Sequence, residues 1–447
     1  LPTTETIRER QLREKISALE LNSATLQPGT GQDDSAKEKL VAAREELTAH
    51  IKKLEENYPG YYKYKYADSV LSLSQFQNFL NTNRQGFLHY FIGDSVSYAL
   101  AINGNETRMI RVENEEYSRN QIDQLASYFA DKGFQNSKYP EFVKASYKFY
   151  SKLFAPLNMS AKNLIICADG FALPFDALSE DENEGHFLVK KFGFSYVYSA
   201  ASLLSKPPAL KASGDFLGFA PVSFKPYLSL ASLTPSAASL DEAAENYSHH
   251  SLFVNDRATR QNLLSNIGNY SIVNIFSHAS AGTDDSEPVL FMQDSVIHLS
   301  ELQYLPTQAA RLVILSACQT SSGKNQLGEG IYSLSRGFAA AGIPTVMATI
   351  WKADEQAVYK ISVAFNRYIS QGMRQDEALQ KAKLDYLEGS TKEQSLPYYW
   401  SNIVLMGTAD PIVLDNTSGM PAWGWGLVIL SGAAALIVVL RARRSKN

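Results

Sequence analysis

Cysteine is scarce in this sequence, and positive charge is not in excess. The 447 residues include only two cysteines, too few for a scaffold built on disulfides. Lysine and arginine number 42 against 46 aspartate and glutamate residues, which gives a net charge of −4. Because no basic surplus is available to neutralise phosphates, nucleic acid is not expected as a partner.

Cofactor signatures are lacking as well. His249 and His250 have no cysteine or carboxylate at the spacing of a metal site. The glycine-rich stretch 321–330 does not contain the G-x-x-x-x-G-K-[ST] pattern of a phosphate-binding loop. We therefore expect no metal and no organic cofactor. The chain begins at Leu1 with neither a methionine nor a cleavable signal, and we expect the natural start to precede it.

Residues 1–57 predict a helical hairpin. Apolar residues recur at helical spacing in 4–22 and in 36–57, and Pro28-Gly29 separates the two stretches. Such a hairpin fits either a coiled coil or the end of an array of helical repeats.

Residues 58–140 predict a small α+β region. Short alternating stretches at 86–104 and 107–113 are typical of β-hairpins. A helical pattern follows over 119–155.

Two later stretches, 271–281 (SIVNIFSHASA) and 311–320 (RLVILSACQT), carry the residues of chemical interest. Each opens with a short aliphatic run, which predicts a buried strand of a parallel sheet. The first run leads to His278 and the second to Cys318. Sites on open parallel sheets lie beyond the carboxyl ends of the strands, where both residues are expected. An imidazole that takes the proton of a thiol creates a nucleophile for a carbonyl group.

A buried, inert cysteine is the alternative interpretation, because free cysteine often packs as a small hydrophobe. Cys167, at the end of the apolar stretch 163–167, is interpreted in that way. Cys318 differs in its neighbours. His278 lies 40 residues upstream, and the local sequence Ser-Ala-Cys-Gln is similar to the Ala-Cys signature of caspases.

Five ordered blocks extend this likeness, namely 163–179, 276–280, 315–320, 328–357 and 396–411. Together they resemble the CHAT family, a branch of the caspase–separase cysteine peptidases. The resemblance implies an α/β fold with a caspase-like, mostly parallel sheet flanked by helices, in a peptidase domain at 141–415. CHAT domains often follow tetratricopeptide repeats, so it also implies that the N-terminal hairpin ends a truncated array.

The resemblance assigns His278 and Cys318 as the catalytic pair. In caspase-type enzymes glycine often follows the catalytic histidine. Here Ala279 occupies that position, and alanine is also small. We expect the backbone N–H groups of Ala279 and Cys318 to bind the oxyanion of the reaction intermediate.

The resemblance also indicates a substrate pocket. In related peptidases the strand end that corresponds to Trp351, Asp354 and Glu355 lines the pocket for the substrate side chain. Asp354 or Glu355 would then favour a basic residue, and Trp351 would wall an apolar one. The alternative is that the two carboxylates cap a helix over 355–369.

Residues 416–447 predict a linker, a membrane anchor and a basic tail. The stretch 422–440 is 19 apolar or small residues long, close to the ~20 that span a bilayer. The positive-inside rule places the basic tail in the cytoplasm and slightly favours an extracytoplasmic or periplasmic peptidase domain. The alternative is a tail-anchored chain with its domain in the cytoplasm.

The combined prediction is a membrane-anchored cysteine endopeptidase that cleaves protein substrates through His278 and Cys318. A regulatory or activating protein is expected at the N-terminal helices. The alternative is a membrane-tethered CHAT interaction module whose catalytic pair is silent. The sequence does not distinguish hydrolysis from transfer of the acyl group to another acceptor.

Overall fold

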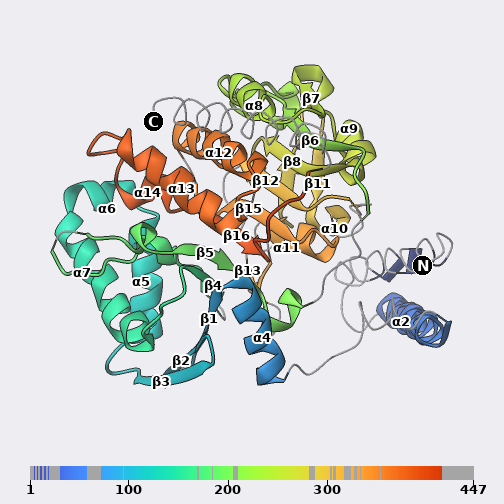
Figure 1. The fold of residues 1–447 in the computed structure, drawn as a ribbon. Helices are drawn as coiled ribbons and strands as arrows, with labels where there is room; N and C mark the ends of the chain where they lie inside the picture. The colour runs from blue at the N-terminus through green and yellow to red at the C-terminus, as the bar shows by residue number, and fades with distance from the viewer. Residues whose placement is uncertain are drawn as a thin grey trace, which may run out of the picture.

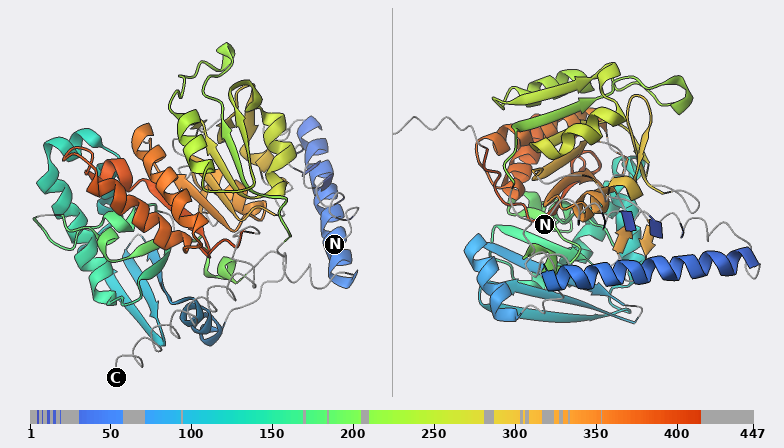
Figure 2. Two further views of the ribbon diagram at one scale, coloured as in Figure 1. Left: turned by 45° about the horizontal axis from the view of Figure 1, so that its top comes forward. Right: turned by 90° about the vertical axis from the view of Figure 1, so that its right-hand side faces the viewer.

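The computed structural model describes residues 31–57 and 72–414, with short gaps, and several helical positions between 5 and 19 (Figures 1 and 2). The gaps after residue 72 are 94, 169–170, 184, 205–209, 281–286, 303–304, 306–308, 317–323, 327–329, 333 and 353.

An eleven-stranded sheet forms the centre of the described structure (Figure 1). In spatial order its strands are β3 (Glu106–Glu113), β2 (Val96–Asn103), β1 (Gln85–Ile92), β4 (Asn163–Ala168), β5 (Gly193–Tyr196), β16 (Ile403–Gly407), β15 (Thr345–Thr349), β12 (Leu312–Ser316), β8 (Tyr270–Phe276), β6 (Gly214–Ala220) and β7 (His250–Val254). Small separate sheets are formed by β9 (Ala279–Ser280), β10 (Val289–Phe291) and β11 (Val296–His298), and by β13 (Lys324–Gln326) with β14 (Gly330–Tyr332).

Most neighbouring strands of the large sheet are parallel. One parallel group is β1, β4 and β5, and the other is β15, β12, β8, β6 and β7. Between the groups, β16 is antiparallel to β15 and meets β5 through one register pair, Met406 with Tyr196. The mixed α/β class with a mostly parallel sheet flanked by helices is thus confirmed.

The predicted hairpins of 86–104 and 107–113 are the antiparallel strands β1 to β3. Strand β1 also pairs with β4, so these hairpins extend the large sheet. The division of the chain near residue 140 stays a prediction.

Helices cover both faces of the sheet (Figure 2). One face carries α5 (Arg119–Phe129), α6 (Lys132–Ser137), α7 (Tyr139–Phe149), α8 (Ser236–Ala244), α12 (Glu355–Ser370), α13 (Gln375–Glu388) and α14 (Pro397–Trp400). The other carries α4 (Leu73–Asn83), α9 (Arg260–Asn266), α10 (Leu299–Leu302) and α11 (Leu334–Ala340). Strand β8 is mostly apolar because both of its faces are covered: Ile272 and Phe276 enter one core, whereas Val273 and Ile275 enter the other.

The N-terminal helix α2 (Gly31–Asn57) begins before the predicted start at residue 36. The helical positions between 5 and 19 lie against it. Lys15 Nζ is 3.0 Å from a carboxylate oxygen of Glu46, and Glu5 Oε2 is 3.7 Å from His50 Nδ1. These contacts agree with a helical hairpin. Neither a tetratricopeptide array nor a coiled coil is shown by the described residues.

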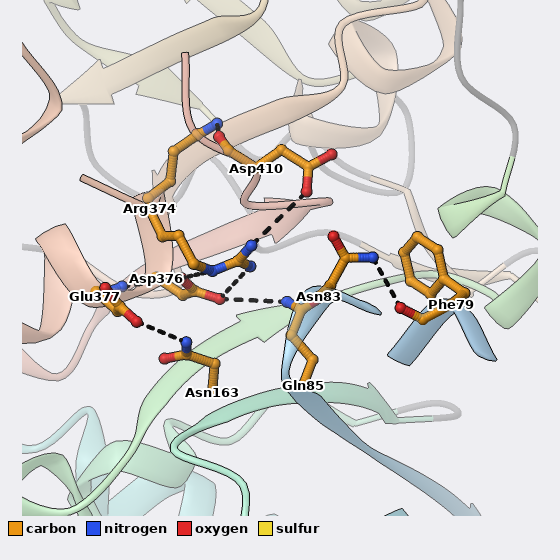
Figure 3. A network of polar contacts seen from close by, with 9 residues as sticks. Phe79, Asn83, Gln85, Asn163, Arg374, Asp376, Glu377 and Asp410 are labelled. Atoms are coloured by element: carbon orange, nitrogen blue, oxygen red, sulfur yellow. Dashed lines mark hydrogen bonds and ion pairs between the residues drawn. The ribbon is translucent and has the colours of Figure 1, made fainter. Parts of the chain in front are cut away.

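Buried charges at the start of α13 tie this helix to the first residues of two strands (Figure 3). Arg374 donates from Nε and Nη2 to the two carboxylate oxygens of Asp376, at 3.2 and 3.0 Å. Asp376 also accepts from Gln85 Nε2 of β1 at 3.3 Å. Next to it, Asn163 Nδ2 of β4 donates to Glu377 Oε1 at 2.9 Å.

A second buried pair lies further along α13. The ammonium group of Lys383 donates to the carboxylate of Asp176 and, at 2.6 Å, to the backbone carbonyl of Ile403 at the start of β16. Lys383 is only 1% exposed. Burial lowers the pKa of Lys383 and raises the pKa of Asp176, each against the attraction of its partner. We call these two assemblies, around Asp376 and around Lys383, the α13 junction.

The prediction of a membrane location is contradicted. No helix in the part of the chain that the structure describes is both long and apolar enough to cross a bilayer. The predicted span, 422–440, and the basic tail lie outside the described residues.

Candidate active site

Strand β8 carries His278 to the edge of the sheet where its parallel neighbours also end. Phe276, the last residue of β8, is in register with Ser316, the last residue of β12. His278 follows two residues after Phe276 and is partly exposed, as predicted for a site beyond the carboxyl ends of the strands. Cys318, two residues after Ser316, lies outside the described residues.

The imidazole of His278 is held by a backbone group. Its Nε2 lies 2.8 Å from the carbonyl oxygen of Ala231. Because a carbonyl oxygen only accepts hydrogen bonds, Nε2 must carry the proton, and Nδ1 of the neutral ring is then an acceptor. The ring of Phe224 packs beside the imidazole, with 5.1 Å between centroids and 44° between planes. The ring is therefore oriented and has one nitrogen left for a donor.

Both contacts come from the loop that follows β6. Val222 begins it with φ of +59°, a conformation that is unfavourable for a β-branched residue and is often found near functional sites. The carbonyl of Val222 accepts a 2.7 Å hydrogen bond from the N–H of the buried Leu233, which closes the loop on itself. The N–H of Lys225 donates to the carbonyl of Gln293 at 3.0 Å, which fastens the loop to the segment between β10 and β11.

Sequence reasoning did not find the carbonyl of Ala231. Every residue has a carbonyl group, so its role depends on the path of the loop and leaves no signature in side-chain types. The left-handed conformation of Val222 is equally invisible, since valine is among the least expected residues there.

The backbone of Ala279 faces away from the neighbouring strand. The N–H of Phe291 donates to the carbonyl of His278 at 3.0 Å, which makes these two residues a hydrogen-bonded pair of the β9–β10 ladder. The next pair, Ala279 with Leu290, is then of the type without hydrogen bonds. The N–H of Ala279 therefore points away from β10 and is available to another acceptor.

The three predicted pocket residues have different environments. Trp351 is buried, its Nε1 donates to the carbonyl of Tyr398 at 3.1 Å, and its ring stacks near Phe129. Asp354 is the N-cap of α12 and accepts from the N–H of Ala357 at 3.0 Å, so the capping alternative is confirmed for this residue. Glu355, in the first turn of α12, is exposed.

The other cysteine is placed as predicted. Cys167 lies in β4, is 4% exposed and packs in the core that α4 covers.

Solved structures with a similar course of the chain include two of gingipain R. The Arg-specific cysteine proteinase gingipain R is 12% identical, with a TM-score of 0.40 over 67% of this chain and 76% of the other. The complex of pro- and mature domains of Porphyromonas gingivalis RgpB is 10% identical, with a TM-score of 0.40 over 66% and 77%. The Saccharomyces cerevisiae separase–securin complex is 12% identical, with a TM-score of 0.38 over 89% of this chain and 27% of that one. Similarities at this level support no functional inference.

Sequence comparison gives a stronger result. No curated protein matches the chain. The family model described as "CHAT domain" matches residues 144–408, which is more than half of the 447 residues. This range contains β4 to β16, with His278 and the segment that leads to Cys318. The chain therefore belongs to the CHAT domain family.

Proposed function

We propose that this chain is a cysteine peptidase whose catalytic pair is His278 and Cys318. The observation that carries the proposal is the fixed imidazole. His278 stands beyond the end of β8 with Nε2 engaged by the carbonyl of Ala231, so Nδ1 is the nitrogen left for a thiol. Membership of the CHAT domain family supports the same reading.

The strand register supports a close approach of the two residues. Phe276 and Ser316 are partners on adjacent strands, which lie about 4.8 Å apart. His278 and Cys318 each follow two residues later, a distance of at most ~7 Å along either chain. Strand ends this close would allow the imidazole of His278 and the thiol of Cys318 to meet.

The proposed reaction is acyl transfer. Nδ1 of His278 takes the proton of the Cys318 thiol, and the thiolate attacks the carbonyl carbon of the substrate peptide bond. The N–H groups of Ala279 and Cys318 bind the resulting oxyanion. The imidazolium then protonates the departing amine as the C–N bond breaks, which leaves a thioester on Cys318. His278 next takes a proton from a water whose oxygen attacks the thioester carbonyl. The C–S bond then breaks, the acid product leaves, and the proton on His278 returns to the sulfur of Cys318.

The carbonyl of Ala231 has a defined part in this scheme. A second N–H of the imidazolium appears at Nδ1 during the reaction, while the Nε2–H keeps its bond to the carbonyl. The dipole of the carbonyl thus stabilises the charged ring and holds it in one orientation. Ala231 is a positioning residue for His278.

Substrate choice and regulation complete the proposal. Glu355 is the predicted pocket carboxylate that stays exposed, and through it the peptidase would prefer a basic residue before the cleaved bond. We assign the N-terminal helices, 1–57, as the contact for a regulatory protein. The alternative is an interaction module whose catalytic pair is silent. The labelling experiment described next distinguishes a peptidase from such a module.

The test is labelling of the folded chain with a library of peptide acyloxymethyl ketones that differ at the residue next to the ketone. Mass spectrometry of digests should find the label on Cys318 and not on Cys167, and the His278→Ala variant should lose the label. A Cys167→Ser variant is the matched control and should label normally. Labelling of Cys318 at an unchanged rate without His278 would refute the pair, and a correctly folded chain that reacts with no member of the library would favour the silent module.

A further inference from the structure

A large cavity lies at the opposite ends of the same strands. Its volume is about 800 Å³. Ser271 of β8, Arg311 just before β12 and Pro344 just before β15 line it where these strands begin. His278 stands beyond the other end of β8, so the cavity is separate from the candidate active site. Its volume falls within the range of ~300–1,000 Å³ typical of ligand sites.

The rim of the cavity exposes large apolar side chains. Tyr198 is 37% exposed, Leu210 51% and Val413 88%. Exposed apolar groups gathered around a hollow are typical of a binding site. The cavity therefore offers apolar contacts to an occupant. The guanidinium of Arg336 lies over one of these side chains, the ring of Tyr198, at 5.8 Å from its centroid.

The charges of the lining are mostly positive. Arg311 and Lys211 line the cavity, and the one acid among its described lining residues, Asp410, lies 3.9 Å from Arg374. The backbone N–H of Arg311 donates to the carbonyl of Ser271 at 2.8 Å, but its guanidinium forms no ion pair within the described part of the chain. This lining favours an occupant with a negative charge.

One buried polar atom in the lining lacks a hydrogen bond. Gln375 is 2% exposed, and its Nε2 donates to the carbonyl of Asp410 at 2.6 Å. Its Oε1 has no donor among the described residues. Because an unpaired buried acceptor is unfavourable, the site favours an occupant that donates a hydrogen bond at this point.

We propose that this cavity binds a short apolar peptide segment of a partner protein, and that the segment carries a carboxylate. The carboxylate pairs with Arg311, a backbone N–H of the peptide donates to Oε1 of Gln375, and apolar side chains contact Tyr198, Leu210 and Val413. A fatty acid would supply the charge and the apolar surface but not the donor. The proposal concerns binding and does not depend on the peptidase activity.

The probe is a phage-displayed library of random eight-residue peptides, selected on the full chain with Cys318→Ala to prevent cleavage. Selected peptides are then synthesised, and their affinity is measured by fluorescence anisotropy. We expect sequences that combine apolar residues with an acid. Replacement of that acid by its amide should weaken binding roughly tenfold or more, since a charge-assisted hydrogen bond is lost.

Matched variants of the chain locate the site. Arg311→Glu should weaken binding by roughly tenfold to a hundredfold, whereas Lys360→Glu, the same charge change at an exposed position of α12, should leave it unchanged. Ala339→Trp fills the cavity from α11 and should block binding, whereas Ala340→Trp at the next exposed position should not. Circular dichroism melting curves confirm that all four variants are folded.

Three outcomes would overturn the proposal. The first is that no acidic, apolar peptide is selected. The second is binding that neither Arg311→Glu nor Ala339→Trp weakens. The third is a chain ending at Leu414 that binds the peptides much more tightly than the full chain does, because residues 415–447 would then be the occupant in place of a partner.

Discussion

The α13 junction and the edge that carries His278 use polar groups in opposite ways. At the junction Asp376, Lys383 and Asp176 are buried, and each is paired with an opposite charge. Arg374, which is partly buried, pairs with Asp376, and Lys383 pairs with Asp176 and a backbone carbonyl. At the edge, the partly exposed imidazole has one hydrogen-bond partner among the described residues, the carbonyl of Ala231.

We expect the two regions to affect different properties, namely the stability of the fold at the junction and the catalytic rate at the edge. A buried charge that loses its partner is strongly unfavourable, so substitutions at the junction should unfold the protein and leave the chemistry of the remaining folded molecules intact. A partly exposed imidazole that is hydrogen-bonded through Nε2 contributes little to folding, but its Nδ1 can accept or donate a proton. Substitutions at the edge should therefore abolish activity and leave the fold intact.

The largest expected effect is on catalysis. His278→Ala should lower kcat/KM for a cleaved peptide by roughly 10²–10⁴-fold, because general acid–base catalysis is lost. The free energy of unfolding, measured with urea, should change by less than about 1 kcal/mol, since a partly exposed side chain is removed. Near-normal cleavage by this variant would remove His278 from the mechanism, and a collapse of the fold would break the contrast.

The next effect is on folding. Lys383→Met leaves the Asp176 carboxylate buried without its cation and should lower the free energy of unfolding by roughly 3–5 kcal/mol. The double variant with Asp176→Leu should recover most of this loss, because no charge is then left buried. Urea unfolding of the single and double variants measures both values. A single variant as stable as the parent would show that the pair is not needed to hold α13.

At the start of α12 the two carboxylates should behave differently. Asp354→Ala should destabilise the protein by about 1 kcal/mol through loss of the N-cap, and Asp354→Asn should restore most of it. Glu355→Gln should hardly change stability. If Glu355 lines the substrate pocket, Glu355→Gln alone should reduce the preference for a basic residue in the ketone library, and an unchanged preference would discard that assignment.

Phe224→Ala tests how firmly the imidazole must be held. Removal of the ring beside His278 should lower kcat/KM by roughly twofold to tenfold, the range expected for one lost aromatic contact. Tyr227→Ala is the matched control in the same loop and should have a smaller effect, because Tyr227 is 70% exposed and its hydroxyl donates to the carbonyl of Asp294 and not to the imidazole. Equal losses in both variants would mean that the loop as a whole matters and not the ring contact.

The smallest effect should come from a surface pair. Lys132 and Glu393 are 2.8 Å apart and about half exposed, and the hydrogen bond from Lys132 lowers the pKa of Glu393. Such a carboxylate stabilises the fold at pH values above its unfolded pKa, and this is lost as the pH falls through the lowered folded value. Glu393→Gln should remove a slight acid dependence of the urea midpoint and leave activity unchanged. A large change would contradict the weak contribution expected of exposed pairs.

Much of the fold is readable from the sequence where burial is complete. The stretches 271–276 and 312–316 carry apolar residues on both faces, which is why their strands and the place of His278 were predictable. Helix starts with polar caps, such as Asp354 before α12, were predictable because a cap depends only on residues that are neighbours in the sequence.

Long-range arrangements were not readable. The carbonyl of Ala231 reaches His278 across 47 positions of the chain, and Lys383 reaches Asp176 across 207. Neither contact leaves a periodic or local signature, because each depends on how distant elements pack. The middle position of β16 between β5 and β15 was missed for the same reason.

That position of β16 has a consequence for synthesis on the ribosome. Strand β5 ends at Tyr196 and its sheet neighbour β16 begins at Ile403, so about 200 residues must be made between them. At ~5–20 residues per second the interval is roughly 10–40 s, during which the two parallel groups have no strand to join them. The growing polypeptide therefore completes its sheet late, and the folded domain is assembled only after nearly all of the sheet has left the ribosome.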